Sequence, residues 1–356
     1  PRGNSFVLVS IGVDATRLFK TLAPVTSFKK VVGKPVPNHM ICYDTDKEMR
    51  AILESDDNIK DNLAPEVKVA LLTAQSSGDG ISPIRVLGAR PQTKNEECID
   101  FNEDVLESVK AIPKCKVISI AFDGLSAESS TVNDHLFAFL LGEDMTIGIM
   151  DPNHAVKSLR SQLVLGSSIV TLGNGYVFDV GLLHEAGVKK SLFVVDDFAS
   201  DQLVIQLCSP KTIEKLLQCN AAESKSVCFM VLTLFFMRLF LTCVNSEHIP
   251  RVMRLRMLWM SLQFITSIDG IHETTAQNFA KAAIGIMCLV AQNDVANVRL
   301  CTSEPNEHFF GNMRSQWAVS RGHLSRITRF MPSGVTMRSR ATCGGWASTM
   351  IAILYS

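Results

Sequence analysis

The sequence predicts a mixed α/β fold, in which a sheet covered by helices is joined to a long, mostly helical block. In the first half of the chain, short β-branched apolar runs alternate with helical patterns. From about Thr212 to Ala296, nearly every segment has a helical pattern rich in Leu, Met and Phe. The 356 residues are 47% hydrophobic and 20% charged, which is typical of a folded globular protein with one large core or two ordinary ones.

The expected strands are short runs that end in turn residues or in an acid. They are Phe6–Val13, Val67–Thr73, Ile81–Leu87, Lys116–Phe122 and Met145–Met150. The segment Ser-Ser-Gly-Asp-Gly between the second and third runs predicts a hairpin. The expected helices of this half are Lys47–Glu54, Asp104–Lys110, Val132–Leu141 and one that begins at Pro152. After Met331 no period is convincing, and we expect a poorly ordered tail.

Charge and cysteine content argue against several classes of protein. Lys+Arg and Asp+Glu are equal at 35 each, so only local patches could attract nucleic acid. The ten cysteines are scattered singly, which argues against a zinc cluster or a disulfide framework and favours a reducing compartment. Arg238 interrupts the apolar stretch Val227–Val244, which we therefore expect to be a buried helix rather than a membrane span. No secretory signal opens the chain, and we expect it to be a piece of a longer protein.

Three acids lie where a metal site needs rigid ligands. Asp14 follows the first strand run and Asp151 follows the Met145–Met150 run, while Glu307 lies in the first turn of a helix begun by Thr302 or Ser303. Carboxylate oxygens suit Mg²⁺ or Mn²⁺, and two such ions about 4 Å apart activate water and stabilise a leaving oxygen.

Each acid alone also has a structural explanation. Asp14 could simply end a strand, and Asp151 before Pro152 is a good helix N-cap. The helix dipole favours Glu307 in a first turn. The catalytic interpretation therefore depends on the joint occurrence of the three.

Three further residues could support or replace these acids. Asp123 ends a central strand run, and Glu304 is a rival for the last acid because it lies three residues before Glu307. His154 could hydrogen-bond a catalytic carboxylate or a phosphate, or could be an ordinary structural histidine.

Two segments resemble motifs of the P element-like and THAP-type DNA transposases of eukaryotes. Asp151–Leu163, DPNHAVKSLRSQL, resembles their strand-to-helix motif D-x-x-H-x-x-K-x-x-R. Thr302–Arg314, TSEPNEHFFGNMR, resembles the motif E-x-F-F-G-x-x-R, which carries the last catalytic acid in that family. Phe122–Gly124 and Leu258–Gly270 are similar to less specific parts of the family pattern, so that the resemblance covers most of residues 1–330.

The resemblance implies an RNase H-like mixed sheet flanked by helices and interrupted by an all-helical insertion. The implied parts are residues 1–163 and 301–330 for the core, 164–300 for the insertion and 331–356 for a tail. It implies that Asp14, Asp151 and Glu307 bind two Mg²⁺ or Mn²⁺ ions. The implied reaction is metal-dependent hydrolysis at transposon ends, followed by attack of the freed 3′-hydroxyl on target DNA. DNA partners, self-association, a nuclear location and no membrane association are also implied.

Basic side chains near these motifs are candidates for binding DNA phosphates. They are Lys157, Arg160, Arg314, Arg321, Arg326 and Arg329. A solvated basic tail is the alternative for the later ones, and a solvated face or internal pairs are expected for Arg251, Arg254 and Arg256.

Two other functions remain open. No Cys/His finger or P-loop occurs in the sequence, and the end of the chain lacks a period. These features are also compatible with a domesticated or decayed transposase that binds DNA or protein without cutting. A nuclease of the same fold that does not join strands is the third alternative.

Overall fold

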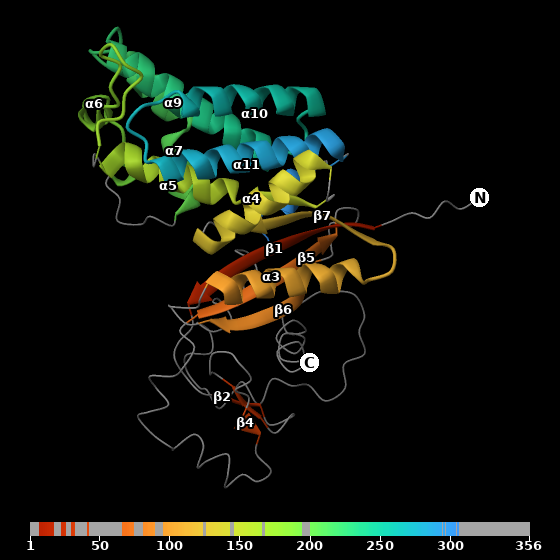
Figure 1. The fold of residues 1–356 in the computed structure, drawn as a ribbon. Coiled ribbons are helices and arrows are strands. Elements are labelled where there is room, and N and C mark those ends of the chain that lie inside the picture. Colours follow the sequence, from red (N-terminus) through yellow and green to blue (C-terminus); the bar gives the residue numbers. More distant parts are fainter. Residues whose placement is uncertain are drawn as a thin grey trace, which may run out of the picture. The chain divides into compact units, whose positions relative to one another are not determined.

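The computed structural model describes most of the chain between Val7 and Pro305 (Figure 1). The described residues are 7–17, 23–25, 30–32, 41–42, 66–74, 81–89, 95–123, 126–142, 146–165, 168–193, 200–293, 295, 297–303 and 305. The expected helix Lys47–Glu54, the last helix with Glu304 and Glu307, and the tail lie outside these residues. Those expectations stay predictions.

The chain divides into two compact units, and strand β1 (Val7–Arg17) passes from one to the other. The first unit comprises Pro1–Ser10 and Lys114–Glu304, and the second comprises Ile11–Pro113 and Pro305–Ser356. The strands of the larger sheet follow the order β6-β5-β1-β7-β8.

In the second unit, β5 (Glu66–Ala74) and β6 (Ile81–Ala89) form the expected antiparallel hairpin, paired from Glu66↔Ala89 to Thr73↔Ile81. Helix α3 (Asn95–Lys110) follows and begins earlier than its apolar pattern indicated. A separate small antiparallel sheet contains β2 (Ala23–Val25), β3 (Lys30–Val32) and β4 (Ile41–Cys42).

In the first unit, β7 (Cys115–Phe122) and β8 (Ile147–Met150) form a parallel pair, from Ser119↔Ile147 to Phe122↔Met150. Parallel neighbours need a crossover, which α4 (Ser126–Leu141) provides. All of β8 is buried, as is usual for a strand covered on both faces. Gly148 lets helices approach closely: a Cβ there would lie 2.7 Å from the Val132 oxygen of α4.

The rest of the first unit is helical, as expected. Its helices are α5 (Pro152–Leu165), α6 (Val180–Glu185), α7 (Asp201–Leu207), α8 (Pro210–Gln218), α9 (Lys225–Asn245), α10 (Arg251–Thr266) and α11 (Glu273–Gln292), with short 3-10 turns η2 (Lys190–Leu192) and η3 (Val298–Cys301). Serine N-caps begin α7, α8 and α9, because a serine hydroxyl accepts a bond from a free backbone N–H of the first turn.

Helix α9 is the core of this helical block. By length and composition it could cross a membrane. It instead packs against α10, α8, α5 and α7, with side chains such as Phe229, Met237 and Phe240 fully buried. Figure 1 shows α9, α10 and α11 as neighbouring layers of one bundle, with α11 also packed on β8. This packing is that of the buried helix the sequence predicted.

Candidate functional site

Asp151 lies at the junction of β8 and α5 and is fully buried. Its backbone N–H donates to the Phe122 carbonyl at 2.8 Å. Its Oδ1 accepts from the N–H of Asn153 at 2.7 Å and from that of His154 at 3.4 Å. With Pro152 as the first helical residue, this is the expected N-cap geometry. The structural explanation of Asp151 as a helix cap is therefore confirmed.

Asp123 lies close to Asp151 because the two residues follow adjacent parallel strands. The carboxyl ends of parallel strands meet at one sheet edge, where α/β proteins usually bind ligands. The Asp123 side chain is 37% exposed, and its Oδ1 lies 3.1 Å from Nδ1 of His154. The structure therefore brings together three of the residues singled out from the sequence: Asp151, Asp123 and His154.

The electrostatic surroundings disfavour a bare negative charge on Asp151. Burial raises its pKa most, and the neighbouring Asp123 raises it further, while the Ser303 hydroxyl, Lys157 and the Asn153 amide act in the opposite direction. The hydrogen bond with Asp123 raises the pKa of His154, against the effect of burial. A cation beside Asp151 would stabilise its ionised form.

Ser303 also belongs to this site. The sequence indicated it only as a possible start of the last helix. Its hydroxyl donates to Oδ2 of Asp151, and the side chain is 1% exposed. Two residues earlier, the buried Cys301 thiol is hydrogen-bonded to Ser10 and Ser119, although burial raises the pKa of this thiol to about 12. Residues 301–303 are thus anchored both to the sheet and to Asp151.

The described structure does not test the placement of the other two predicted ligands beside Asp151. Asp14 lies in the part of β1 that belongs to the second unit and is 6% exposed. We expected the strand to end before Asp14, but it continues to Arg17. Glu307 and its rival Glu304 lie outside the described residues. The meeting of the three acids remains a prediction.

The residues present fit a hard divalent cation. No group of three or more His, Cys, Asp or Glu side chains suited to a metal occurs among the described residues. The described part of the site nevertheless has the right donors, because the carboxylates of Asp151 and Asp123 offer oxygen ligands. Burial disfavours the ionised form of Asp151 by raising its pKa, and a cation would offset this effect. Asp151 is the residue of this pair that would hold the ion most rigidly.

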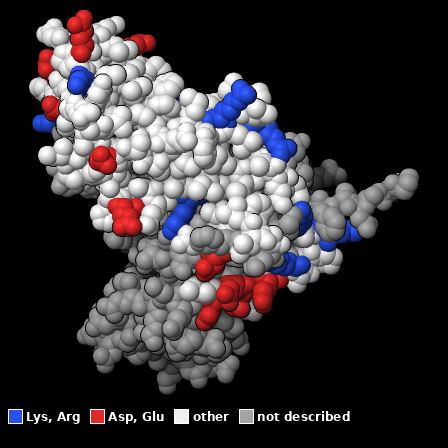
Figure 2. All heavy atoms as spheres, turned by 45° about the horizontal axis from the view of Figure 1, so that its top comes forward, with Lys and Arg blue, Asp and Glu red and all other residues white. Residues whose placement is uncertain are grey.

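The two basic residues of α5 that were predicted to bind DNA are buried or paired within the protein. Arg160 is fully buried, so its guanidinium belongs to the core and is out of reach of a phosphate in this conformation. Lys157 Nζ lies 3.0 Å from Oδ1 of Asp201, and its side chain is 11% exposed. The face drawn in Figure 2 shows the basic side chains of the described residues singly or in small groups. The other predicted DNA-binding residues, Arg314, Arg321, Arg326 and Arg329, lie outside the described residues.

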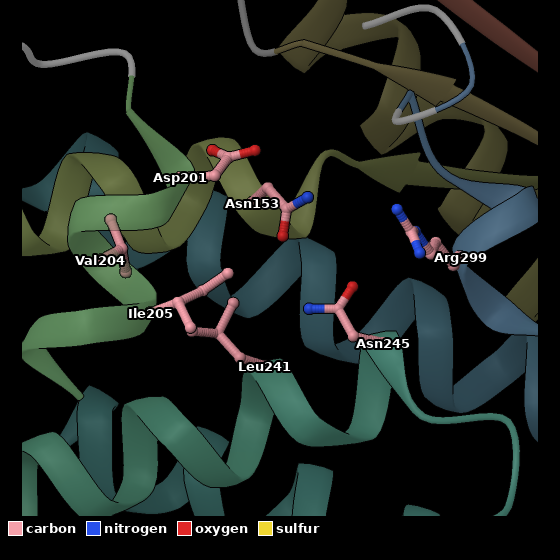
Figure 3. Close-up of a pocket in the computed structure, with 7 residues that line it drawn as sticks. All are labelled: Asn153, Asp201, Val204, Ile205, Leu241, Asn245 and Arg299. Carbon is pink, nitrogen blue, oxygen red and sulfur yellow. The ribbon is translucent and has the colours of Figure 1, made fainter. Parts of the chain in front are cut away.

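A pocket of about 260 Å³ lies in the first unit beside the start of α5 (Figure 3). The amides of Asn153 and Asn245 and the guanidinium of Arg299 lie around one space, with an apolar wall beside them. The full lining is Asn153, Asp201, Val204, Ile205, Leu241, Asn245 and Arg299. The pocket was not predicted, because its residues come from four separate elements. It adjoins the site through Asn153, whose backbone N–H holds Asp151.

We expect the metal-free protein to lose stability as the pH rises. Because the pKa of Asp151 is raised, the folded state binds more protons than the unfolded state above the ordinary aspartate value of about 3.9. Stability must then fall as pH rises through the folded pKa. The raised pKa of His154 has the same sign, in a window that begins near its ordinary value of about 6.5.

Urea unfolding in EDTA, from about pH 4 to about pH 8, measures this slope. Asp151→Asn removes the contribution of the carboxyl group and should flatten the acidic part of the curve. Identical pH slopes for the wild type and Asp151→Asn would contradict the electrostatic description of the site.

The chain has a mixed sheet, with acids after its parallel strands, and this sheet is joined to a helical block. Its class is therefore a helix-flanked α/β domain with a helical insertion. No family model and no curated protein matches the sequence. Among solved structures, the chain is similar to the one titled "Drosophila P element transposase strand transfer complex", with a TM-score of 0.62 and 13% identity, covering 88% of this chain and 73% of that one. At this identity the likeness shows the fold, and it confirms the RNase H-like fold that the sequence resemblance implied.

Proposed function

We propose that this chain is the catalytic core of a P element-like DNA transposase. Asp14, Asp151 and Glu307 would bind two Mg²⁺ or Mn²⁺ ions and cut and join phosphodiesters. The observation that carries the proposal is the hydrogen bond from Ser303 to Asp151. This bond connects Asp151, the predicted second acid, with the segment that precedes Glu307, the predicted last acid. The two acids belong to separate motifs of the resemblance.

The covalent chain limits how far Glu307 can lie from this contact. Glu307 lies four positions after Ser303, and four positions span at most about 14 Å when extended and about 6 Å in a helix. This limit supports a shared site for Asp151 and Glu307.

The roles follow from where the chain holds each acid. The N-cap bonds of α5 and the Ser303 hydroxyl hold Asp151 on rigid elements, as a metal ligand requires. Asp123 would support the site from the next strand end and orient His154. Two bound ions would supply an activated water and stabilise the leaving oxygen. One solved structure with this fold is titled a strand transfer complex, which supports DNA as the substrate. A nuclear location is part of the proposal.

The experiment is Mn²⁺-dependent nicking of supercoiled plasmid, and strand transfer of an oligonucleotide with a free 3′-hydroxyl, by purified protein. Asp14→Asn and Glu307→Gln should each lower both rates at least about a hundred-fold, since each removes a metal ligand. Asp269→Asn is the matched control, because Asp269 is exposed and lies outside the site, where its backbone forms an isolated β-bridge with Thr171. Wild-type rates in both variants would contradict the assignment.

One observation favours a second candidate, a decayed transposase that binds DNA or protein without cutting. Both carboxylate oxygens of Asp151 make hydrogen bonds inside the protein, so folding alone could explain this aspartate. Such a protein would bind plasmid DNA yet show no Mn²⁺-dependent nicking with all its acids intact. Calorimetric titration with Mn²⁺ separates the two candidates, because only the enzyme requires a cation at Asp151.

A further inference from the structure

We infer that Ser303 is a positioning residue for the metal site: its hydroxyl sets the orientation of the Asp151 carboxylate and thereby the affinity for a divalent cation. This inference rests on the proposed function, since it requires that Asp151 binds the ion. Neither the motif resemblance nor the helix-start pattern around Ser303 assigns this residue a role toward Asp151.

Different parts of the chain hold the two oxygens of Asp151. The backbone N–H of Asn153 holds Oδ1 at 2.7 Å, and the Ser303 hydroxyl donates to Oδ2. A carboxylate rotates easily about its last side-chain bond, so one contact would leave its plane loosely defined. Bonds to both oxygens fix the plane. An ionised carboxylate has about four acceptor sites, so these bonds do not use all of them.

Ser303 can orient Asp151 because the core fixes Ser303 itself. The preceding η3 turn packs against β7 and α9. The Cys301 thiol bonds to the hydroxyls of Ser10 and Ser119, which lie 2.9 Å from each other. The Thr302 hydroxyl donates to the Arg299 carbonyl at 2.8 Å. The serine hydroxyl is thus presented from a fixed backbone, as a supporting group of a metal ligand should be.

A hydroxyl suits this role better than a cationic side chain. A lysine or arginine in its place would neutralise Asp151 and compete with the metal ion. The hydroxyl orients the carboxylate and leaves its charge available. The nearby Lys157 is directed to Asp201 instead, at 3.0 Å.

The test compares Ser303→Ala with Ser303→Thr, which keeps the hydroxyl, and with Ser267→Ala, which removes an exposed hydroxyl that bonds the Phe264 carbonyl outside the site. Mn²⁺ affinity is measured by calorimetry, and folding by urea unfolding. We expect Ser303→Ala to weaken Mn²⁺ binding about ten- to hundred-fold, the usual effect of removing a supporting partner of a ligand. Ser303→Thr and Ser267→Ala should bind Mn²⁺ like the wild type, whatever their stability. If Ser303→Ala does not fold, Ser303→Cys, a weak donor of similar shape, replaces it.

Asp151→Asn in the same titration separates the two possible failures. If Asp151→Asn abolishes Mn²⁺ binding while Ser303→Ala keeps wild-type affinity, the positioning role is overturned and the proposed function stands. If Asp151→Asn binds Mn²⁺ like the wild type, the proposed function fails, and the positioning role fails with it.

Discussion

Replacing Asp151 with asparagine is expected to abolish Mn²⁺-dependent nicking while the protein stays folded. Asparagine caps helices about as well as aspartate, so the bond to the Asn153 N–H should persist. The Ser303 hydroxyl can rotate to accept from the new amide. The lost negative charge removes several kcal/mol of metal-mediated stabilisation of the transition state, or about a thousand-fold in rate. The free energy of unfolding should change by less than about 1 kcal/mol.

Asp151→Ala is the matched variant, because it removes both the charge and the cap. The Asn153 N–H and the Ser303 hydroxyl would lose their acceptor in a buried place, at a cost of about 1–3 kcal/mol in the free energy of unfolding. Nicking rates and urea midpoints of the two variants therefore separate function from folding. If Asp151→Asn nicked DNA as fast as the wild type, the carboxylate would have only its capping role.

The fold was largely predictable because its strands and helices depend on local signals. The β5–β6 hairpin has turn residues at its centre, and β7 and β8 are short, mostly apolar runs. The end of β1 was predicted less well. The apolar run stops at Val13, but strand pairing continues through Asp14 to Arg17, because backbone hydrogen bonds with a neighbouring strand do not require an apolar side chain.

The site was only partly predictable, because its remaining features depend on packing between distant segments. Asp151 and Asp123 were found because acids after buried strands are visible in the sequence. The Ser303 contact joins residues 152 positions apart, and no periodicity indicates it. Arg160 was expected to contact DNA, but nine of the fourteen residues of α5 are buried, since α11, α7 and α9 pack against this helix. A basic residue in a motif is therefore weak evidence for a DNA contact.

Arg254 shows the same limit and leads to the largest stability effect we expect. A solvated face or an internal pair was expected for it, but the guanidinium is 2% exposed and donates to the carbonyls of Cys243 at 2.6 Å and Ser246 at 2.8 Å. These carbonyls end α9, where the helix has no backbone donors left and its dipole favours a cation. Arg254→Ala should lower the free energy of unfolding by about 3–5 kcal/mol, because it leaves the carbonyls unsatisfied and opens a cavity.

Arg256→Ala is the matched control, because Arg256 lies on the exposed side of α10. It should change the free energy of unfolding by less than about 0.5 kcal/mol. Urea unfolding monitored by circular dichroism measures both effects. Equal midpoints for the two variants would show that Arg254 does not hold α9 to α10.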